Sequence, residues 1–330
     1  MKRSYYIYNN GSLRRKDNTL TFTDENDDKR DLPIEQINDI YVMSEMTFNT
    51  SLINLLSQYG IPVHFFNYYS FYTGSFYPRE HLVSGNLLVS QVEHYTDHEK
   101  RMELAKAFIE GASYNIYRNL RYYNGRGKDV QSYMDAIEDL RKQIPKAQSI
   151  QELMGYEGNI RKTYYSAWPV IIDQEIEFEK RVKNPPDNMV NTLISFVNTL
   201  IYTKVLGEIY QTQLNPTVSY LHEPGDRRFS LSLDLAEIFK PILGDRLIFS
   251  LLNRKQITEK SFTKGLNYLH LSQNASKTIV AELDAKMQTT IKHKALNKTV
   301  SYQYLIRLEC YKLVKHLLGE KVYEPFKIWW

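Results

Sequence analysis

The sequence predicts an α+β protein with two domains: a small N-terminal β-rich domain, residues 1–85, and a larger all-α domain, residues 86–330. Two observations support this division. Short runs of branched and aromatic residues, several alternating in period two, fill residues 1–80, as half-buried strands require. From about residue 85 the apolar residues recur with helical spacing instead, which places the join near residues 80–95.

The N-terminal region is expected to contain strands, one hairpin and one short helix. Residues 4–8 and 12–16 are joined by Asn-Asn-Gly, and Asn-Gly supplies the positive φ angles of a tight turn, so they predict a β-hairpin. Thr50 or Ser51 caps the expected helix, which Gly60 ends. Further strands are expected at residues 19–23, 37–43 and 61–66.

The second region begins with its most periodic segment, residues 97–123. One stripe of apolar residues recurs there every three or four positions: Met102, Ala105, Ile109, Ala112, Ile116 and Leu120. The sequence NGRGK at 124–128 then breaks the helix, and prolines separate later elements. Further helices are expected over residues 131–144, 150–168, 188–211 and 230–241.

Composition excludes several classes of protein. No segment has about 20 consecutive apolar residues, so we expect no membrane span, and MKRSYYIYNN lacks the apolar stretch of a signal peptide. Cys310 is the only cysteine, which excludes a disulfide framework and a thiolate-rich zinc site and fits a reducing cytoplasm. Residues 251–330 carry 14 Lys and Arg against 6 Asp and Glu. This basic quarter favours an anionic partner such as nucleic acid, although a solvated helical surface has the same composition.

The segment 219–241, SYLHEPGDRRFSLSLDLAEIFKP, concentrates groups that can do chemistry. His222 precedes a basic turn, and the helix after it contains Asp234 and Glu237, three residues apart on one face. One imidazole with one or two carboxylates suits Mn²⁺ or Mg²⁺ better than structural zinc, because hard cations favour oxygen ligands. A second interpretation needs no metal: Asp234 is an N-cap, Glu237 its capping-box partner and His222 a hydrogen-bonded core histidine.

Glu157 is a further carboxylate in an unusual place. It lies in a helical pattern, MGYEGNIRKTYYSAW, that contains Gly155 and Gly158, and each glycine costs about 1 kcal/mol in a helix interior. That cost is easier to understand where backbone or ligand must approach closely. The alternative is a helix boundary at residues 155–158, with Glu157 exposed.

Together these stretches resemble the CRISPR-associated spacer-acquisition integrase and endonuclease family. MGYEGNIRKTYY is similar to the segment that carries the family's glutamate ligand, and LNPTVSYLHEPGDRRFSLSLDLAEIFKPILGDR to the segment that carries its histidine and aspartate ligands. PPDNMVNTLISFVNTLIY is similar to its signature helix, with Asp187 and Asn191 at the characteristic positions. GSLRRKDNTLTF and VYEPFKIWW also match, so the resemblance covers nearly the whole chain. It departs from the family at Ser219, where a glycine is usual, and at residues 69–71.

The resemblance implies a metal-dependent DNA endonuclease and integrase. Glu157, His222 and Asp234 would hold Mg²⁺ or Mn²⁺, and Glu237 and Asn191 would assist. The 3′-hydroxyl of a captured DNA fragment would attack a phosphodiester at the edge of a CRISPR repeat, so a cation and positioning would carry the reaction. The N-terminal domain would be β-sandwich-like and would form a homodimer, and the helical domain would be catalytic. A small ferredoxin-like CRISPR-associated protein would join two such dimers on double-stranded DNA.

Two DNA substrates require many phosphate contacts. Six basic residues near the predicted ligands are candidates, although any single one is more often a surface charge: Arg227, Arg228, Lys240, Arg246, Arg254 and Lys255. Two other functions stay open: a non-catalytic DNA-binding scaffold of the same family, and a general metal-dependent nuclease for branched DNA. Because all three predicted ligands are present, the sequence favours the enzyme over the scaffold.

Overall fold

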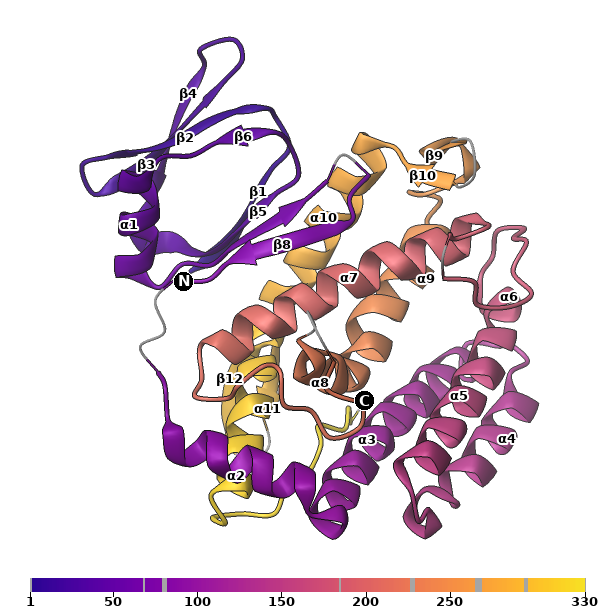
Figure 1. The fold of residues 1–330 in the computed structure, drawn as a ribbon. Helices are drawn as coiled ribbons and strands as arrows, with labels where there is room; N and C mark the ends of the chain where they lie inside the picture. Colours follow the sequence, from indigo (N-terminus) through magenta and orange to yellow (C-terminus); the bar gives the residue numbers. More distant parts are fainter. Residues whose placement is uncertain are drawn as a thin grey trace. The chain divides into compact units, whose positions relative to one another are not determined.

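The computed structural model describes residues 2–67, 69–78, 82–183, 185–225, 229–264, 269–293 and 296–329. The chain divides into two compact units, Met1–Val83 and Ser84–Trp330 (Figure 1). The first unit is rich in strands and the second is mainly helical, which confirms the predicted α+β class.

In the described part of the N-terminal unit, the strands form two four-stranded sheets. Their strands are β1 (Arg3–Ile7), β2 (Gly11–Lys16), β3 (Thr19–Asp24), β4 (Lys29–Pro33), β5 (Ile37–Val42), β6 (Met46–Thr47), β7 (Val63–Phe66) and β8 (Tyr72–Phe76). One sheet has the order β1-β5-β7-β8 and is mixed, and the other has the order β4-β3-β2-β6. Buried side chains from both sheets, including Leu13, Leu20 and Ile40, belong to a single core, as a sandwich-like domain requires.

The hairpin predicted at the N-terminus is wrong. β1 and β2 both form, but β1 pairs with β5 and β2 pairs with β3, in different sheets. The connection through Asn9 and Asn10 therefore carries the chain from one sheet to the other. Gly11 is needed there for space, because a Cβ would lie 2.1 Å from the carbonyl oxygen of Thr23.

The helix α1 (Thr50–Tyr59) forms where the sequence predicts it, but with a different cap. The side chain of Asn49 accepts a hydrogen bond from the backbone N–H of Leu52 and caps the helix instead of Thr50 or Ser51. Gly60 ends the helix in the left-handed conformation, with φ 64°, as predicted.

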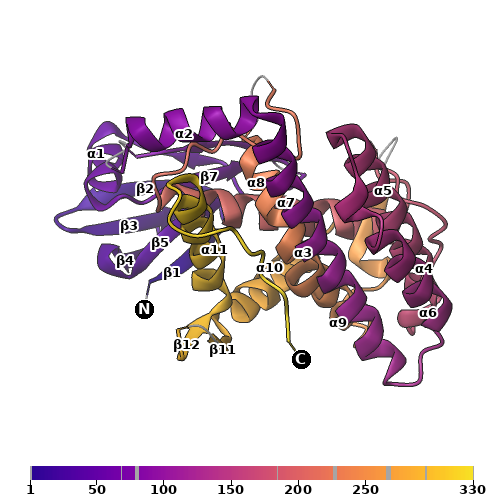
Figure 2. The same ribbon diagram turned by 90° about the horizontal axis from the view of Figure 1, so that it is seen from below.

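The second unit is built around long helices. They are α2 (Gly85–Thr96), α3 (His98–Asn124), α4 (Gln131–Arg141), α5 (Ile150–Ser166), α6 (Trp168–Ile171), α7 (Met189–Tyr210), α8 (Ser230–Phe239), α9 (Arg246–Asn253), α10 (Gln273–Gln288) and α11 (Tyr302–Leu317). A π-helical turn, η3 (Lys240–Asp245), joins α8 to α9. Figures 1 and 2 show α3, α4 and α5 side by side, with α8 packed between α3 and α7.

Within the described residues, two short hairpins interrupt this unit, which the sequence predicts to be all-α. β9 (Phe262–Lys264) pairs with β10 (Leu269–Leu271), and β11 (Thr290–His293) pairs with β12 (Lys298–Ser301). Both hairpins are two-stranded and lie outside the helices that carry the site residues.

The helix α7 is a core helix of this unit. It is long and apolar enough to cross a membrane, but 78% of its most apolar stretch is buried inside the protein, as in the core helix of a globular domain. Its buried Glu208 is satisfied by α11, where Arg307 Nε lies 2.6 Å and Gln303 Nε2 2.9 Å from the carboxylate. Within the described ranges no other helix passes the same length and hydropathy test.

Two buried asparagines of α3 hold the junction between α8 and η3. Asn115 Nδ2 donates to the carbonyl oxygen of Ile238 at 3.0 Å, and Asn119 Nδ2 donates to that of Pro241 at 2.6 Å. A π-helical turn shifts the backbone out of α-helical register, so carbonyls near it need other donors. The predicted apolar stripe of α3, from Met102 to Leu120, is buried along its whole length.

The segment after α11 returns to the same point on α3. Asn115 Nδ2 also donates to the carbonyl oxygen of Phe326 at 3.1 Å, and Asn115 Oδ1 accepts from the backbone N–H of Ile328 at 2.9 Å. One buried side chain therefore binds both the C-terminal segment and the end of α8.

His316 makes the docking of this C-terminal segment sensitive to pH. Its Nδ1 accepts a hydrogen bond from the backbone N–H of Tyr323 at 3.1 Å, so a proton on Nδ1 would face another donor. Burial lowers the pKa of His316 below its ordinary value, while Glu103 on α3 opposes the shift and His94 on α2 adds to it.

Because the folded-state pKa of His316 is lowered, the unfolded chain binds this proton more readily, and stability falls as the pH drops below about 6.5. We expect His316→Asn, which keeps an acceptor near the Nδ1 position, to flatten the acid limb of the unfolding free energy between about pH 7 and pH 5, by up to ~1.4 kcal/mol per pH unit. Urea denaturation across this range measures it, with the exposed His98→Asn as control. An acid limb as steep as that of the wild type would contradict the role given to His316.

Candidate active site

Asp234 is the fixed centre of the site. It lies inside α8 and is fully buried. Its Oδ2 accepts hydrogen bonds from the backbone N–H groups of Tyr220 at 2.7 Å and Leu221 at 3.0 Å. Its Oδ1 accepts from the backbone N–H of His222 at 2.9 Å and lies 2.8 Å from His222 Nδ1. Three consecutive N–H groups around one carboxylate fix the backbone of the loop that presents His222.

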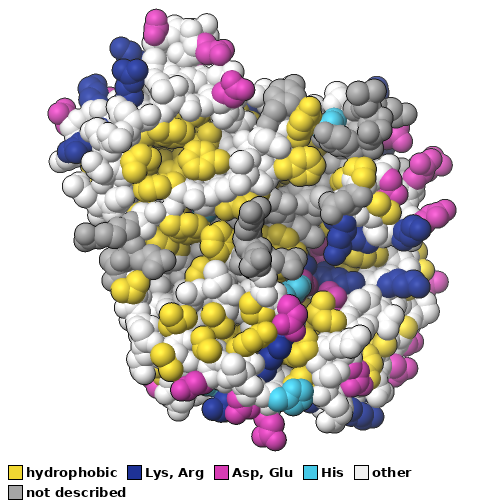
Figure 3. Space-filling model, viewed as in Figure 1, with side chains coloured by type: hydrophobic (Ala, Val, Ile, Leu, Met, Phe, Trp, Pro, Cys, Tyr) yellow, Lys and Arg dark blue, Asp and Glu magenta, His cyan; other side chains and the backbone are white. Residues whose placement is uncertain are grey.

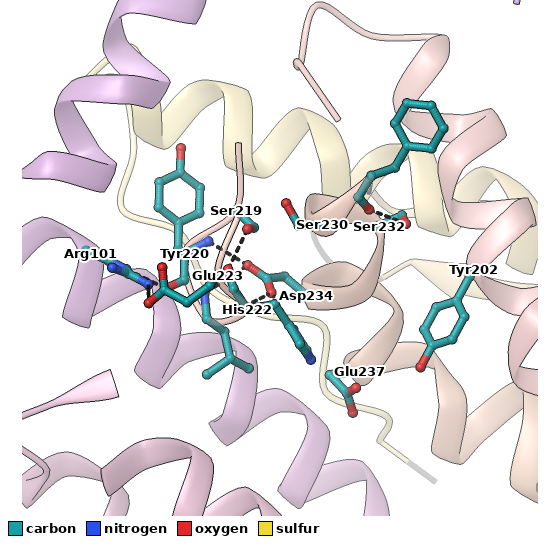
Figure 4. A network of polar contacts seen from close by, with 12 residues as sticks. Arg101, Tyr202, Ser219, Tyr220, His222, Glu223, Ser230, Ser232, Asp234 and Glu237 are labelled. Atoms are coloured by element: carbon teal, nitrogen blue, oxygen red, sulfur yellow. Dashed lines mark hydrogen bonds and ion pairs between the residues drawn. The ribbon is translucent and has the colours of Figure 1, made fainter. Parts of the chain in front are cut away.

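His222 is oriented by this contact. Because the Asp234 carboxylate only accepts, Nδ1 carries the proton and the neutral ring keeps a lone pair on Nε2. Figure 4 shows this second nitrogen pointing away from Asp234 and toward Glu237. Burial alone would lower the pKa of His222, but the hydrogen bond to Asp234 and the charges of Asp234 and Glu237 raise it above its ordinary value. A raised pKa favours the protonated ring, and when the ring is neutral its lone pair on Nε2 faces Glu237.

The loop around His222 is anchored on both sides. Arg101 of α3 donates to the carbonyl oxygen of Tyr220 at 2.9 Å and to the carboxylate of Glu223 at 2.6 Å. Ser219 Oγ donates to the carbonyl oxygen of His222 at 2.6 Å. The departure from the family's usual glycine at Ser219 therefore adds a hydrogen bond to this loop.

Glu237 lies one turn further along α8 and is 4% exposed. Arg161 Nη2 binds one of its oxygens, and Lys240 Nζ binds the other. Burial opposes ionisation, but Lys240, Arg161 and His222 lower the pKa of this carboxyl below its ordinary value. Glu237 is therefore ionised at neutral pH.

Glu157 reaches the same cluster from α5. Its Oε1 accepts a hydrogen bond from Arg161 Nε at 3.2 Å, and the same guanidinium binds Glu237. Arg161 thus bridges a carboxylate on α5 and a carboxylate on α8.

The helix α5 runs unbroken past Glu157, so the alternative of a helix boundary at residues 155–158 is wrong. A Cβ on Gly155 or on Gly158 would meet nothing within 4 Å. No other segment of the described protein approaches these glycines closely, and the helix surface beside Glu157 is open.

The interpretation of Asp234 and Glu237 as a capping box is also wrong. The helix α8 begins at Ser230, four residues before Asp234, and both carboxylates are buried inside it. Burial of two acidic side chains in one helix has a cost that only strong hydrogen bonds or cations offset.

The structure brings His222 and Asp234 together but does not support Asp234 as a ligand, because both of its oxygens are occupied by hydrogen bonds from the loop. Over the described part of the chain, no three His, Cys, Asp or Glu side chains lie close enough to hold a metal ion as they stand. Glu157 and Glu237 are instead bridged by Arg161. The carboxylate that faces Nε2 of His222 is that of Glu237, for which the family resemblance implies only an assisting role.

Asn191 has a structural role. Its Nδ2 donates to the carboxylate of Asp187 at 2.7 Å and to the carbonyl oxygen of Lys180 at 3.0 Å, and its Oδ1 accepts from the backbone N–H of Val182 at 3.2 Å. These bonds tie the loop before α7 to its first turn, and none of them reaches the cluster around Arg161.

The six basic residues predicted to contact DNA have different environments. Lys240 is buried beside Glu237, and its Nζ also donates to the hydroxyl of Tyr202 at 3.2 Å. The guanidinium of Arg246 stacks on the ring of Tyr122, 4.5 Å from the ring centroid. Arg254 and Lys255 are exposed. Arg227 and Arg228 lie outside the described residues.

Sequence reasoning missed two charged residues of the site. Arg161 follows Glu157 by four positions, which is the spacing of an ion pair on a helix, so a signal existed. No sequence signal pointed to Asp245, because only tertiary folding places its Oδ2 3.8 Å from Arg161 Nη1. On the face of the helical unit in Figure 3, basic side chains gather between α8 and α5, next to a histidine and acidic side chains.

The sequence matches one family over most of its length: residues 5–285 match the family described as CRISPR associated protein Cas1. A Fusobacterium nucleatum protein named CRISPR-associated endonuclease Cas1 is 68% identical over 330 residues, which cover 100% of this chain and 98% of that protein. A Methanobrevibacter ruminantium protein named CRISPR-associated protein Cas1 1 is 49% identical over 329 residues, covering 100% and 99%.

Solved structures with the same fold were also found. A Cas1 protein from Thermotoga maritima is 40% identical and superposes with a TM-score of 0.88 over 97% of this chain and 99% of that chain. A casposase described as bound to an integration product is 21% identical and has the same fold, with a TM-score of 0.87 over 98% of this chain and 93% of that chain. The family match, the relatives and the shared fold over nearly the whole chain place this protein in the class of CRISPR-associated proteins. The chain belongs to the Cas1 family.

Proposed function

We propose that this protein is a divalent-cation-dependent DNA endonuclease and integrase that inserts spacer DNA into a CRISPR array. Its relatives carry the name CRISPR-associated endonuclease, and a casposase of the same fold is described as bound to an integration product. The single observation that carries the proposal is the imidazole of His222, oriented by Asp234 toward Glu237, in a cluster that Glu157 also enters.

The cation would bind Nε2 of His222 and the carboxylates of Glu157 and Glu237. One imidazole nitrogen with two carboxylates is a donor set that suits Mg²⁺ or Mn²⁺. The ionised state of Glu237 fits this role. Asp234 would orient His222 without touching the cation, as carboxylates beside metal-binding histidines commonly do. When bound, the cation would stabilise charge on the phosphoryl group and on the departing 3′-oxygen.

The protein's own side chains would position the DNA and neutralise its charge. The attacking 3′-hydroxyl belongs to the DNA, so the reaction needs no nucleophilic side chain. Lys240 and Arg161 place two positive charges beside the carboxylates, which lowers the cost of bringing a phosphate close to them. The open surface of α5 at Gly155 and Gly158 leaves room for a DNA backbone to approach Glu157.

We further propose that the substrates are the spacer precursor and the repeat as double-stranded DNA. The N-terminal unit would form a homodimer, and a small ferredoxin-like CRISPR-associated protein would join two dimers. Two solved complexes that share the fold are described as containing Cas2, which supports a partner of this kind.

The test is strand joining between a labelled duplex with free 3′-hydroxyls and a plasmid that carries a repeat array. We expect joined product with Mn²⁺ or Mg²⁺, no product with excess EDTA, and recovery when Mn²⁺ is restored. Glu157→Gln should lower the joining rate by more than about 100-fold, because a cation contributes several kcal/mol at the transition state. The exposed Glu175→Gln should react at the wild-type rate. Joining that is indifferent to EDTA would remove the metal mechanism.

A further inference from the structure

Arg161 lies at the centre of three carboxylates. Its Nε donates to Glu157 Oε1 at 3.2 Å, its Nη2 binds Glu237 Oε2, and its Nη1 lies 3.8 Å from Asp245 Oδ2. The side chain is 10% exposed. Burial opposes the charge of the guanidinium, but the carboxylates raise the pKa of Arg161 well above its ordinary value. Arg161 is therefore a permanent positive charge inside the site.

The proposed cation and Arg161 compete for the same two carboxylates. A divalent cation held by Glu157 and Glu237 needs at least one oxygen from each, and Arg161 occupies one oxygen of each. The other oxygen of Glu237 is bonded to Lys240. A cation placed among these groups would also repel the guanidinium at short range.

Asp245 offers Arg161 a partner that the cation would not use. It lies at the end of η3 and is 1% exposed. Asp245 lies nearest to Nη1 of Arg161, whereas Glu157 and Glu237 bind Nε and Nη2. Burial raises the pKa of the Asp245 carboxyl to about 6, against the opposing charges of Arg161 and Lys240. A positive charge moved closer to this carboxylate would gain a hydrogen bond that the present 3.8 Å separation does not provide.

We propose that Arg161 is a displaceable counter-ion: it pairs Glu157 with Glu237 in the metal-free protein, and it shifts to Asp245 when a divalent cation takes their oxygens. The inference rests on the proposed metal site. In this role Arg161 keeps two neighbouring carboxylates together before the cation arrives, and it weakens cation binding because it must first be displaced. It is a positioning residue, not a ligand.

The test is the affinity for Mn²⁺ without DNA, measured by calorimetry and by the electron paramagnetic resonance signal of free Mn²⁺. Arg161→Gln should bind Mn²⁺ at least about tenfold more tightly than the wild type, because a nearby positive charge is removed. The metal-free variant should have a lower Tm, and Mn²⁺ should raise that Tm by more than it raises the wild-type Tm. A residue that only supported the structure would not tighten Mn²⁺ binding when it was removed.

Asp245→Asn is a second variant, for which we expect the opposite change in Mn²⁺ affinity. Arg161 then lacks the partner to which it shifts, so Mn²⁺ should bind at least about threefold more weakly than in the wild type. The matched control for Arg161→Gln is Lys162→Gln, which removes one exposed positive charge from the adjacent position of α5. It should leave the affinity for Mn²⁺ within about twofold of the wild type.

The outcomes separate this inference from the proposed function. A wild-type protein that binds no Mn²⁺ would overturn the metal site itself. A wild type that binds Mn²⁺, with Arg161→Gln no tighter, would overturn the counter-ion role and leave the metal site standing. If Arg161→Gln does not fold, Asp245→Asn still tests the role: Mn²⁺ binding that is unchanged or tighter in this variant overturns it.

Discussion

Glu237→Gln should abolish cation-dependent cleavage and joining of DNA, with a loss of more than about 100-fold at saturating Mn²⁺. The substitution keeps the size of the side chain but removes the negative charge that faces Nε2 of His222 and that Arg161 and Lys240 flank. Joining rates and Mn²⁺ affinity measure the effect. Glu237→Asp is the matched variant, because it retains a carboxylate and should recover part of the activity.

The same substitution should also destabilise the protein. It leaves Arg161 and Lys240 buried with one carboxylate fewer, and breaking a buried ion pair costs about 3–5 kcal/mol. Activity must therefore be measured well below the Tm of the variant, with folding checked by circular dichroism. Wild-type joining rates in a folded Glu237→Gln protein would show that Glu237 is not a ligand.

Asp234→Asn should weaken Mn²⁺ binding by about 10–100-fold without removing it, because Asp234 acts through His222. An amide can accept only through its oxygen, and its NH₂ group would face backbone N–H donors of the loop or Nδ1 of His222. We expect the free energy of unfolding to fall by about 2–4 kcal/mol, since buried donors lose their acceptor. Urea denaturation and calorimetry with Mn²⁺ measure the two effects.

This variant also separates the two assignments of the ligand set. If Asp234 were the ligand and Glu237 the helper, the pattern would reverse. Mn²⁺ binding would then disappear in folded Asp234→Asn and persist in Glu237→Gln.

Much of the architecture could be predicted from local patterns. The period-two runs before residue 80 and the buried stripe of α3 specify the two units, because such patterns directly report which side faces a core. Strand pairing could not be predicted in the same way. Asn-Gly favours a tight turn, but the close approach of Gly11 to β3 and the parallel pairing of β1 with β5 depend on segments far along the chain.

The candidate site, too, could be predicted only in part from the sequence. Resemblance and residue chemistry pointed to Glu157, His222 and two carboxylates on one helix. Sequence could not say which of those carboxylates faces the imidazole's second nitrogen. That depends on a loop whose three N–H groups close around Asp234 and use up its oxygens. The role of Asp245 was equally invisible, since it depends on where η3 packs against α5.

The contacts of Asn115 impose an order on assembly during synthesis. Its amide binds Ile238, next to Glu237, and also Phe326 and Ile328, which the ribosome adds more than 200 positions after Asn115 itself. While a nascent protein still lacks those last residues, Asn115 keeps an acceptor and a donor unsatisfied next to α8. The polar partners of Asn115 beside α8 are therefore complete only after translation has passed residue 328, so partly made chains leave this side chain with one of its three bonds.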